Sequence, residues 1–407
     1  MSAPYTFLCI STIFKGNDFL QACKESGNTV WLITDSLLAE KPWVRESIDT
    51  IFYVDQLPSG GYDLGQMVEK LAIAMRSQKI DRVVALDDLD MERAAQIREY
   101  FRIPGMGQTT GSYFRDKLAM RTKALEAGIR VPGFSALFND AEIEAFIAEF
   151  PGPWMLKPRS EAKVTGIQKL HTAEALWAGI QSLGSDRHAY LVEKYTSGDV
   201  FHIDSITYNG RVVFLWSSQY LSPPFEVASI GGIFKSITVP FDSAVAHSLE
   251  TMAVDLLKAF GLTQSASHTE IIRSHDDGRY YFLETSSRVV GAYLSEMVEA
   301  SSGVNLWKEW AKMETAVVAN EVYKLPPLRQ DYAGIIKARV PQEWADDRIF
   351  DDPEIFWRMN EPYQIGLVVR ASTQQRVMEL LDKYTLLIQE QFLKNTPDTS
   401  LPANSGQ

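Results

Sequence analysis

The chain has 407 residues, of which 45% are hydrophobic and 23% charged, a composition typical of a globular protein with two or three domains. Its net charge of −12 at pH 7 argues against a general binder of nucleic acids or anionic membranes, and we find neither a membrane-spanning apolar run nor a signal peptide. The only two cysteines, Cys9 and Cys23, exclude a disulfide framework and a cysteine-based metal site, so we expect a cytoplasmic location.

The first hundred residues alternate between apolar strands and amphipathic helices. Strands are predicted over 5–14, 29–34, 50–54 and 82–86, and helices over 18–26, 62–77 and 89–101. This alternation indicates a small parallel α/β unit, which ends in the glycine- and proline-containing segment 103–111. Asp87 and Asp88 follow the fourth strand, at the edge where such sheets bind ligands, but capping of the next helix is the role we expect for them.

A second unit begins with a helix that Asp116 starts. Residues 153–170 then predict a strand, a polar loop and another strand. This segment carries one glycine and several basic residues: Gly166, Lys157, Arg159 and Lys163. Such a loop is suited to covering phosphate groups, although an ordinary surface loop would be equally polar.

The middle of the chain predicts an antiparallel sheet flanked by helices. A helix over 172–183 and the strand 189–195 lead to a candidate hinge at 196–198. Asn209-Gly210, between two apolar runs, is a strong hairpin signal, and a long amphipathic helix follows over 243–260.

Two further strands, joined by a polar turn at 274–278, form the most informative hairpin. Side chains alternate along a strand, so Glu270 lies on one face of the first strand, while Glu284 and Arg288 share a face of the second. If pairing brings these faces together, two carboxylates and a guanidinium converge, and such oxygen ligands suit Mg²⁺ or Mn²⁺. The alternative is that both glutamates are ordinary exposed strand residues.

After this hairpin, a helix is predicted over 304–319 and a proline-broken linker over 324–330. The remaining strands and a helix over 374–394 predict a small α+β unit, followed by a polar tail. His202, His268, Arg339 and Arg370 could contact a substrate, but we expect structural roles for the two histidines and ordinary surface salt bridges for the two arginines.

Six short motifs occur in a fixed order: Asp116-Lys117, Gly128 followed by Val131-Pro132, Lys157-Pro158, Glu193-Lys194-Tyr195, His268-Thr269-Glu270 and Glu284-Thr285-Ser286-Ser287-Arg288. Together they resemble the ATP-grasp superfamily, in particular its carbamoyl-phosphate-synthetase-like carboxylate–amine ligases. The segments HTEI and LETSSRVVG look most similar to L-amino acid ligases, which make dipeptides.

The resemblance implies a multidomain α/β and α+β fold. Its expected parts are an N-terminal parallel α/β (pre-ATP-grasp) domain over 1–112, an ATP-grasp core over 113–320 with a mobile lid over about 124–194, a C-terminal α+β cap over 321–395 and a disordered tail over 396–407.

The same resemblance implies residue roles. The residues that would bind ATP are Lys117, Lys157, Arg159, Gly166, Glu193, Lys194, Tyr195, Glu270 and Glu284. Lys157 and Arg288 would be catalytic, with Arg288 stabilising an acyl phosphate. The ligands of Mg²⁺ or Mn²⁺ would be Glu270, Glu284 and Ser286.

Two departures from the family pattern affect these expectations. Ser286 stands where many members have a metal-ligating asparagine, and serine is the poorer ligand. The lid loop has a single glycine, Gly166, where biotin carboxylases have a glycine-rich run, which argues against bicarbonate chemistry.

The expected activity is ATP-dependent joining of a small carboxylate, such as an amino acid, to an amine through an acyl phosphate, with release of ADP and phosphate. Positioning and cationic stabilisation by lysine, arginine and Mg²⁺ do most of the work in such a phosphoryl transfer. The resemblance also implies a homodimer, and neither nucleic acid nor membrane is an expected partner. The alternatives are an ATP-grasp carboxylase or kinase, or a non-catalytic nucleotide-binding regulatory protein.

Overall fold

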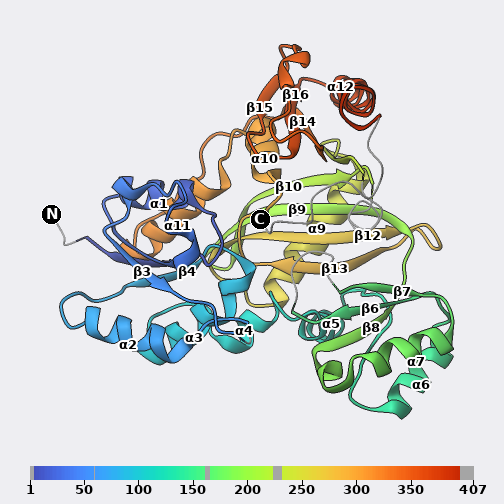
Figure 1. Cartoon of the computed structure of the whole chain (residues 1–407), viewed down its shortest axis with the longest axis horizontal. Coiled ribbons are helices and arrows are strands. Elements are labelled where there is room, and N and C mark those ends of the chain that lie inside the picture. The colour runs from blue at the N-terminus through green and yellow to red at the C-terminus, as the bar shows by residue number, and fades with distance from the viewer. Residues whose placement is uncertain (1–3, 59, 161–165, 223–231, 395–407) are drawn as a thin grey trace.

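The computed structural model describes residues 4–58, 60–160, 166–222 and 232–394. An eight-stranded sheet lies in the centre, with a four-stranded N-terminal sheet to one side and another four-stranded sheet to the other (Figure 1). Lys163 of the predicted phosphate loop and the predicted disordered tail, 396–407, lie outside the described residues. Across the part of the chain that is described, no helix combines the length and the apolar character needed to cross a membrane.

The N-terminal sheet is parallel, with strand order β3-β2-β1-β4, as the sequence predicts. Its strands are β1 (Thr6–Ile10), β2 (Thr29–Asp35), β3 (Thr50–Val54) and β4 (Arg82–Ala85). Side chains of β1 alternate between two cores: Phe7 and Cys9 pack with residues of α1 (Asn17–Glu25), whereas Leu8 and Ile10 pack with residues of α2 (Leu64–Ala74) and α3 (Met91–Phe101). The predicted boundary 103–111 is not wholly irregular, because it contains the start of a short helix, α4 (Gln108–Ser112).

The central sheet is antiparallel, in the order β13-β12-β9-β10-β11-β14-β16-β15. Its strands are β9 (Gly198–Tyr208), β10 (Arg211–Tyr220), β11 (Phe234–Thr238), β12 (Ser265–Ser274), β13 (Tyr280–Ser286), β14 (Tyr332–Arg339), β15 (Ile355–Arg358) and β16 (Gln364–Ala371). The predicted hairpin turn between β9 and β10 is present, and both of its residues, Asn209 and Gly210, have positive φ, as a tight two-residue hairpin requires. The C-terminal strands do not form a separate sheet, because β14 pairs with β11.

Helices pack on the faces of this sheet, and α9 lies behind its strands β9 and β10 (Figure 1). They are α9 (Ala244–Ala259), α10 (Leu294–Ser302), α11 (Leu306–Ala319) and α12 (Gln374–Ile388), with a π-helical turn over Gln389–Leu393. Helix α12 packs on β11, β14 and β16, and α11 packs on α1 of the N-terminal unit. The sequence did not predict α10, which packs on β14 and β16.

The third sheet is small, antiparallel and ordered β5-β8-β6-β7. Its strands are β5 (Phe134–Ala136), β6 (Trp154–Pro158), β7 (Gln168–Leu170) and β8 (Tyr190–Lys194), with helices α6 (Asp140–Glu149) and α7 (Ala173–Ser182). Trp154 and Leu156 point to the core beneath these helices, so Met155 and Lys157 point to the other face. Helix α5 (Lys117–Glu126), which Asp116 caps as predicted, leads into this sheet.

Candidate active site

The strand pairing of the β12–β13 hairpin places Glu270 directly opposite Glu284. His268 and Ser286 form another cross-strand pair of the same hairpin, and the ladder has an irregularity between Glu270 and Ile271. Opposite residues in antiparallel strands have Cβ atoms about 4.5–5.5 Å apart, so the two carboxylates share one neighbourhood. The predicted meeting of the two faces is therefore confirmed.

Lys117, at the start of α5, forms an ion pair with Glu284, with 3.0 Å between Nζ and Oε2. Partial removal of water raises the pKa of Glu284, but the charges of Lys117 and Lys157 together outweigh this effect, and the net pKa lies below the ordinary value. The backbone N–H of Lys117 donates to the carbonyl oxygen of Arg159 at 2.9 Å. The side chain of Arg159 in turn binds Asp116, with Nε 3.0 Å from Oδ1. The end of β6 is thus tied to the start of α5.

Lys157 and Arg121 hold the carboxylate of Glu193 between them. Nζ of Lys157 lies 2.6 Å from Oε2 of Glu193, and Nε of Arg121 lies 2.6 Å from Oε1. The side chains of Glu193 and Arg121 are each only 1% exposed. Burial raises the pKa of Glu193, but the two cations outweigh burial and lower it. The Glu193 carboxylate is therefore paired with two cations inside the protein, which the sequence did not predict.

Lys194 and Tyr195, the other two residues of the Glu193-Lys194-Tyr195 motif, use their backbone donors within the third sheet. The N–H of Lys194 donates to the carbonyl of Gly133 at 2.8 Å, and that of Tyr195 to the carbonyl of Pro153 at 2.9 Å. Nζ of Lys169 stands 3.4 Å from the centre of the Tyr195 ring. Any contact of this segment with a nucleotide must use other groups than these two N–H donors.

Arg288 is held by the N-terminal unit. Its Nε donates to Oδ2 of Asp88 at 2.9 Å, and Nη2 contacts the same oxygen. Burial lowers the pKa of Arg288, but the carboxylates of Asp88, Asp87 and Glu284 together raise it more, so the guanidinium stays charged. The capping prediction is right for Asp87, which accepts from the N–H of Leu89, and wrong for Asp88, whose carboxylate binds Arg288.

Sequence reasoning missed Lys15, which lies beside Arg288. Nζ of Lys15 is 3.1 Å from Oδ2 of Asp87 and 3.4 Å from the carbonyl oxygen of Val289. A usable signal was present: Lys15 follows β1 and Asp87 follows β4, and the carboxyl ends of adjacent parallel strands meet at one edge.

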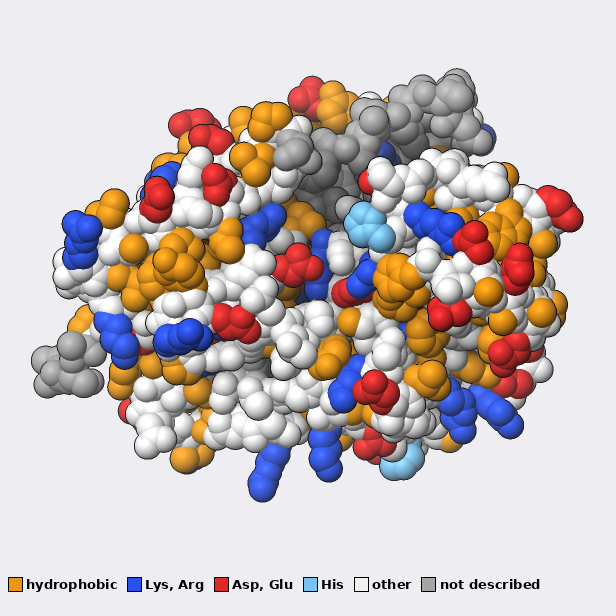
Figure 2. Space-filling model, turned by 90° about the horizontal axis from the view of Figure 1, so that it is seen from below, with side chains coloured by type: hydrophobic (Ala, Val, Ile, Leu, Met, Phe, Trp, Pro, Cys, Tyr) orange, Lys and Arg blue, Asp and Glu red, His pale blue; other side chains and the backbone are white. Residues whose placement is uncertain are grey.

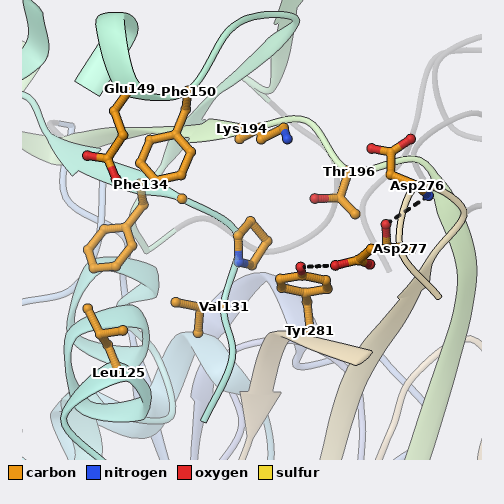
Figure 3. Close-up of a pocket in the computed structure, with 13 residues that line it drawn as sticks. Leu125, Val131, Phe134, Glu149, Phe150, Lys194, Thr196, Asp276, Asp277 and Tyr281 are labelled. Atoms are coloured by element: carbon orange, nitrogen blue, oxygen red, sulfur yellow. Dashed lines mark hydrogen bonds between the residues drawn. The ribbon is translucent and has the colours of Figure 1, made fainter. Parts of the chain in front are cut away.

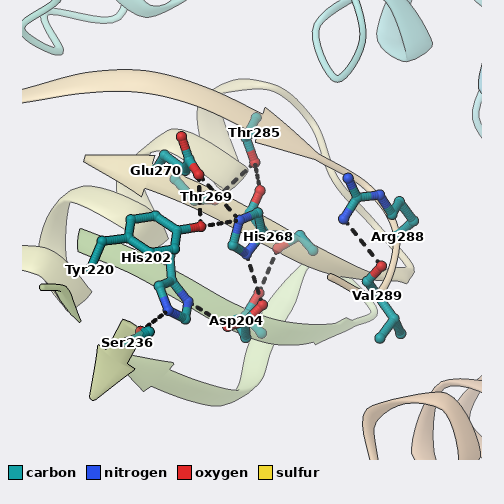
Figure 4. A network of polar contacts seen from close by, with 12 residues as sticks. His202, Asp204, Tyr220, Ser236, His268, Thr269, Glu270, Thr285, Arg288 and Val289 are labelled. Carbon is teal, nitrogen blue, oxygen red and sulfur yellow. Dashed lines mark hydrogen bonds and ion pairs between the residues drawn. The ribbon is translucent and has the colours of Figure 1, made fainter. Parts of the chain in front are cut away.

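The two histidines near the hairpin lie in a polar network (Figure 4). His202 is completely buried and His268 nearly so, and both contact Asp204. The expectation of a structural role for His202 is consistent with this burial. The hydroxyl group of Tyr220 donates to Oε1 of Glu270 at 2.8 Å, so this network reaches the predicted metal ligand.

Of the remaining predicted residues, Gly166 has φ +76°, a left-handed conformation that favours glycine. A Cβ at Gly166 would lie 3.0 Å from Cγ of Pro158, so the chain approaches closely at this point. On the face of the molecule shown in Figure 2, basic and acidic side chains gather around a central hollow.

A cavity of about 600 Å³ lies between α5, the third sheet and the turn of the β12–β13 hairpin (Figure 3). Its walls include the apolar side chains of Val131 and Phe134 and the turn residue Asp277. Of the predicted site residues, Lys194 lines this cavity, whereas Glu270, Glu284 and Arg288 do not. The cavity is therefore distinct from the cluster of charged residues described above.

Comparison with known proteins gives a consistent result. No family model matches the chain. The L-arginine-specific L-amino acid ligase of Bacillus subtilis is 26% identical over 297 residues, which cover 71% of this chain and 70% of that protein. The D-alanine–D-alanine ligase of Janthinobacterium sp. (strain Marseille) is 26% identical over 253 residues, covering 58% of this chain and 78% of that protein.

Solved structures extend the likeness over nearly the whole chain. The L-amino acid ligase of Bacillus licheniformis has a TM-score of 0.74 at 14% identity and covers 96% of this chain and 98% of its own. The biotin carboxylase domain of Hydrogenobacter thermophilus 2-oxoglutarate carboxylase, solved with MgADP and bicarbonate, has a TM-score of 0.71 at 17% identity, with 96% and 91% covered. The chain is thus similar in sequence to ATP-dependent amino acid ligases and in fold to solved ATP-grasp proteins, and the predicted fold class is confirmed.

Proposed function

We propose that this protein is an ATP-dependent ligase that joins an amino acid, or another small organic acid, to an amine through an acyl phosphate, with release of ADP and phosphate. The observation that carries the proposal is the convergence of Glu270 and Glu284 on neighbouring strands, with Lys117 bound to one of them. The 26% identity to an L-arginine-specific L-amino acid ligase supports an amino acid as one substrate.

The donor set fits a magnesium nucleotide. Glu270 and Glu284 would supply oxygen ligands, which hard cations such as Mg²⁺ or Mn²⁺ prefer. Ser286 lies two residues after Glu284 on β13. When bound, the cation supplies neutralisation of the charge on the phosphates. The side chain of Glu284 is 41% exposed, so a ligand can reach it.

Lysine and arginine side chains would hold the phosphates. Lys117 and Lys157 each have a carboxylate partner in this structure, Glu284 and Glu193. Nucleotide phosphates would recruit both ammonium groups by the same charge-assisted bonds. We propose that the lid consists of residues of about 124–194, and Arg159 and Gly166 flank its phosphate loop. Closure of this lid would exclude water from the reactive acyl phosphate.

Arg288 would stabilise the charge that develops on the carbonyl oxygen of the acyl phosphate when the amine attacks. Its guanidinium is already charged and oriented by Asp88 before substrate arrives. Such preorganised donors usually supply the largest part of the rate enhancement, and removal of one typically costs about 10²–10³ in rate. Lys194 and Tyr195 remain in the proposal as residues that would bind the adenine of ATP, through groups other than their backbone N–H donors.

The test is a phosphate-release screen of the purified protein with pairs of amino acids and other carboxylates and amines, with product masses measured by mass spectrometry. We expect ADP and phosphate only when an acid and an amine are both present, together with an amide product. Release of AMP and pyrophosphate would overturn the proposal. Dependence on bicarbonate, or a stable phosphorylated product, would instead indicate a carboxylase or a kinase. An Arg288→Met variant, expected to be at least about 10²-fold slower, excludes a contaminating ATPase.

A further inference from the structure

Asp204 lies in the middle of the central sheet, on β9, and binds two imidazole rings at once. Nδ1 of His202 is 2.9 Å from its Oδ2, and Nδ1 of His268 is 2.9 Å from its Oδ1 (Figure 4). The Asp204 side chain has no exposed surface. Burial raises the pKa of Asp204, but the two histidines lower it to about 2. A carboxylate therefore sits between the two rings.

Two nitrogens and an oxygen of these residues lie within 4.8 Å of one another, which raises the question of a metal ion. Both Nδ1 atoms are at hydrogen-bonding distance from the carboxylate, and Nε2 of His202 is 2.8 Å from Oγ of Ser236. The polar atoms that would face an ion are thus already engaged with one another. The group is better explained as a hydrogen-bonded support than as a metal site.

On the side away from Asp204, the ring of His268 faces Glu270 and Tyr220. Its Nε2 is 3.6 Å from Oε1 of Glu270 and 3.5 Å from the hydroxyl group of Tyr220. That hydroxyl donates to the same Oε1 at 2.8 Å. The Tyr220 hydroxyl group and the His268 ring therefore both face Oε1 of Glu270. The His268 ring is in turn held by Asp204 through its other nitrogen, Nδ1.

We propose that Asp204, acting through His268, is a positioning residue for the carboxylate of Glu270. A carboxylate that ligates a cation has to be held against rotation, and partners behind the ligands commonly change metal affinity or activity by about 10–100-fold. The inference rests on the proposed function, because it takes Glu270 as a ligand of the metal–nucleotide complex. It adds a residue that does not itself touch the substrate.

The test compares the wild-type chain with Asp204→Asn, which keeps the shape of the side chain but removes its charge. The matched control is Ser267→Ala. Ser267 neighbours His268 on β12 and points to the opposite face. Its replacement by alanine removes a buried 2.6 Å hydrogen bond to Ser205. Both variants disturb the same two strands, but only one interrupts the path to Glu270.

Binding of Mn²⁺ is measured by electron paramagnetic resonance in the presence of ADP, without acid or amine. We expect the apparent Kd for Mn²⁺ to rise about 10–100-fold in Asp204→Asn and less than about twofold in Ser267→Ala. Should Asp204→Asn fail to fold, His268→Asn interrupts the same path one residue later and is expected to give the same rise. An unchanged Kd in the folded variant, or an equal rise in the control, overturns the inference.

The two proposals fail in different ways. A wild type that binds Mn²⁺ with ADP but yields no amide would contradict the ligase function and leave the role of Asp204 standing. A wild type that makes amide while Asp204→Asn retains full Mn²⁺ affinity would contradict only the role of Asp204. A wild type that binds no Mn²⁺ with ADP would overturn the role of Asp204, because Glu270 would then have no metal to position.

Discussion

Arg288 and Asp88 lie 200 residues apart in the chain, yet Nε of Arg288 donates to Oδ2 of Asp88 at 2.9 Å. The arginine follows the last strand of the hairpin that carries Glu270 and Glu284, whereas the aspartate follows β4 of the N-terminal sheet. The N-terminal unit therefore contributes directly to the geometry of the site. It does so through the carboxyl edge of a parallel sheet, where such folds usually bind ligands.

The first prediction concerns this contact. Asp88→Asn should leave the protein folded but lower kcat by about 10²-fold, since a misplaced catalytic group costs roughly that much, while KM for ATP changes little. Steady-state kinetics with the amide-forming substrate pair measure it. The control is Asp81→Asn, at the opposite end of β4, where Asp81 accepts from the N–H of Thr6 at 3.0 Å. Equal kcat values for Asp88→Asn and wild type would show that Asp88 does not orient Arg288.

A second prediction tests the metal assignment. Glu284→Ala should lower kcat/KM by about 10²–10³-fold, because the cation contributes several kcal/mol of charge stabilisation at the transition state. The same variant should lose Mn²⁺ binding in the presence of ADP, measured by electron paramagnetic resonance. Circular dichroism should show an unchanged fold, because this side chain is 41% exposed. Full activity in the folded variant would mean that Glu284 is not a metal ligand.

A third prediction concerns Lys157. Lys157→Met should raise KM for ATP about 10–100-fold, as expected from the loss of a hydrogen bond to a charged group worth about 1.5–3 kcal/mol. The fold should persist because Arg121 still holds Glu193. Lys123→Met serves as the control, since Lys123 pairs with Glu126 along α5 and its Nζ stands 5.7 Å from the centre of the Tyr113 ring. An ATP KM equal to that of wild type would remove Lys157 from the phosphate site.

The elements that local patterns specify were predictable. Alternation and the turn at 274–278 were sufficient to propose the hairpin, and Asp116 marked the start of α5. The convergence of Glu270 and Glu284 was one of two open possibilities, because it depends on the register of the strands, and the ladder has an irregularity between Glu270 and Ile271.

Contacts between distant segments were not predictable from such patterns. The Asp88–Arg288 pair depends on how the N-terminal sheet docks against the hairpin, which no local spacing encodes. The same applies to Glu193. The alternation of side chains along its strand predicts which face Glu193 lies on, but it does not predict that Arg121 of helix α5 contacts it. The pairing of β14 with β11 is a further long-range contact, and the linker that precedes β14 concealed it.

The last prediction concerns stability. Glu193→Gln should lower the free energy of unfolding at pH 7 by about 3–5 kcal/mol. The guanidinium of Arg121, which is 1% exposed, would remain a buried charge without the negative charge of Glu193 beside it. Denaturant unfolding of the purified variant measures this. Glu126→Gln, which removes one partner of an exposed pair on the same helix, should cost less than about 1 kcal/mol. Similar losses in both variants would contradict a special role for the buried pair.

The same variant has a pH signature. Burial raises the pKa of Glu193 and its two cations lower it more, so the folded pKa lies below the ordinary value of 4.5. The folded state thus binds fewer protons than the unfolded state just below pH 4.5, and wild-type stability decreases as the pH falls through that range. Glutamine cannot titrate, so the acid-induced loss of stability should be smaller in Glu193→Gln than in wild type. Unfolding curves between pH 3 and pH 7 would show this as a flatter dependence, and parallel curves would mean that Glu193 has no lowered pKa.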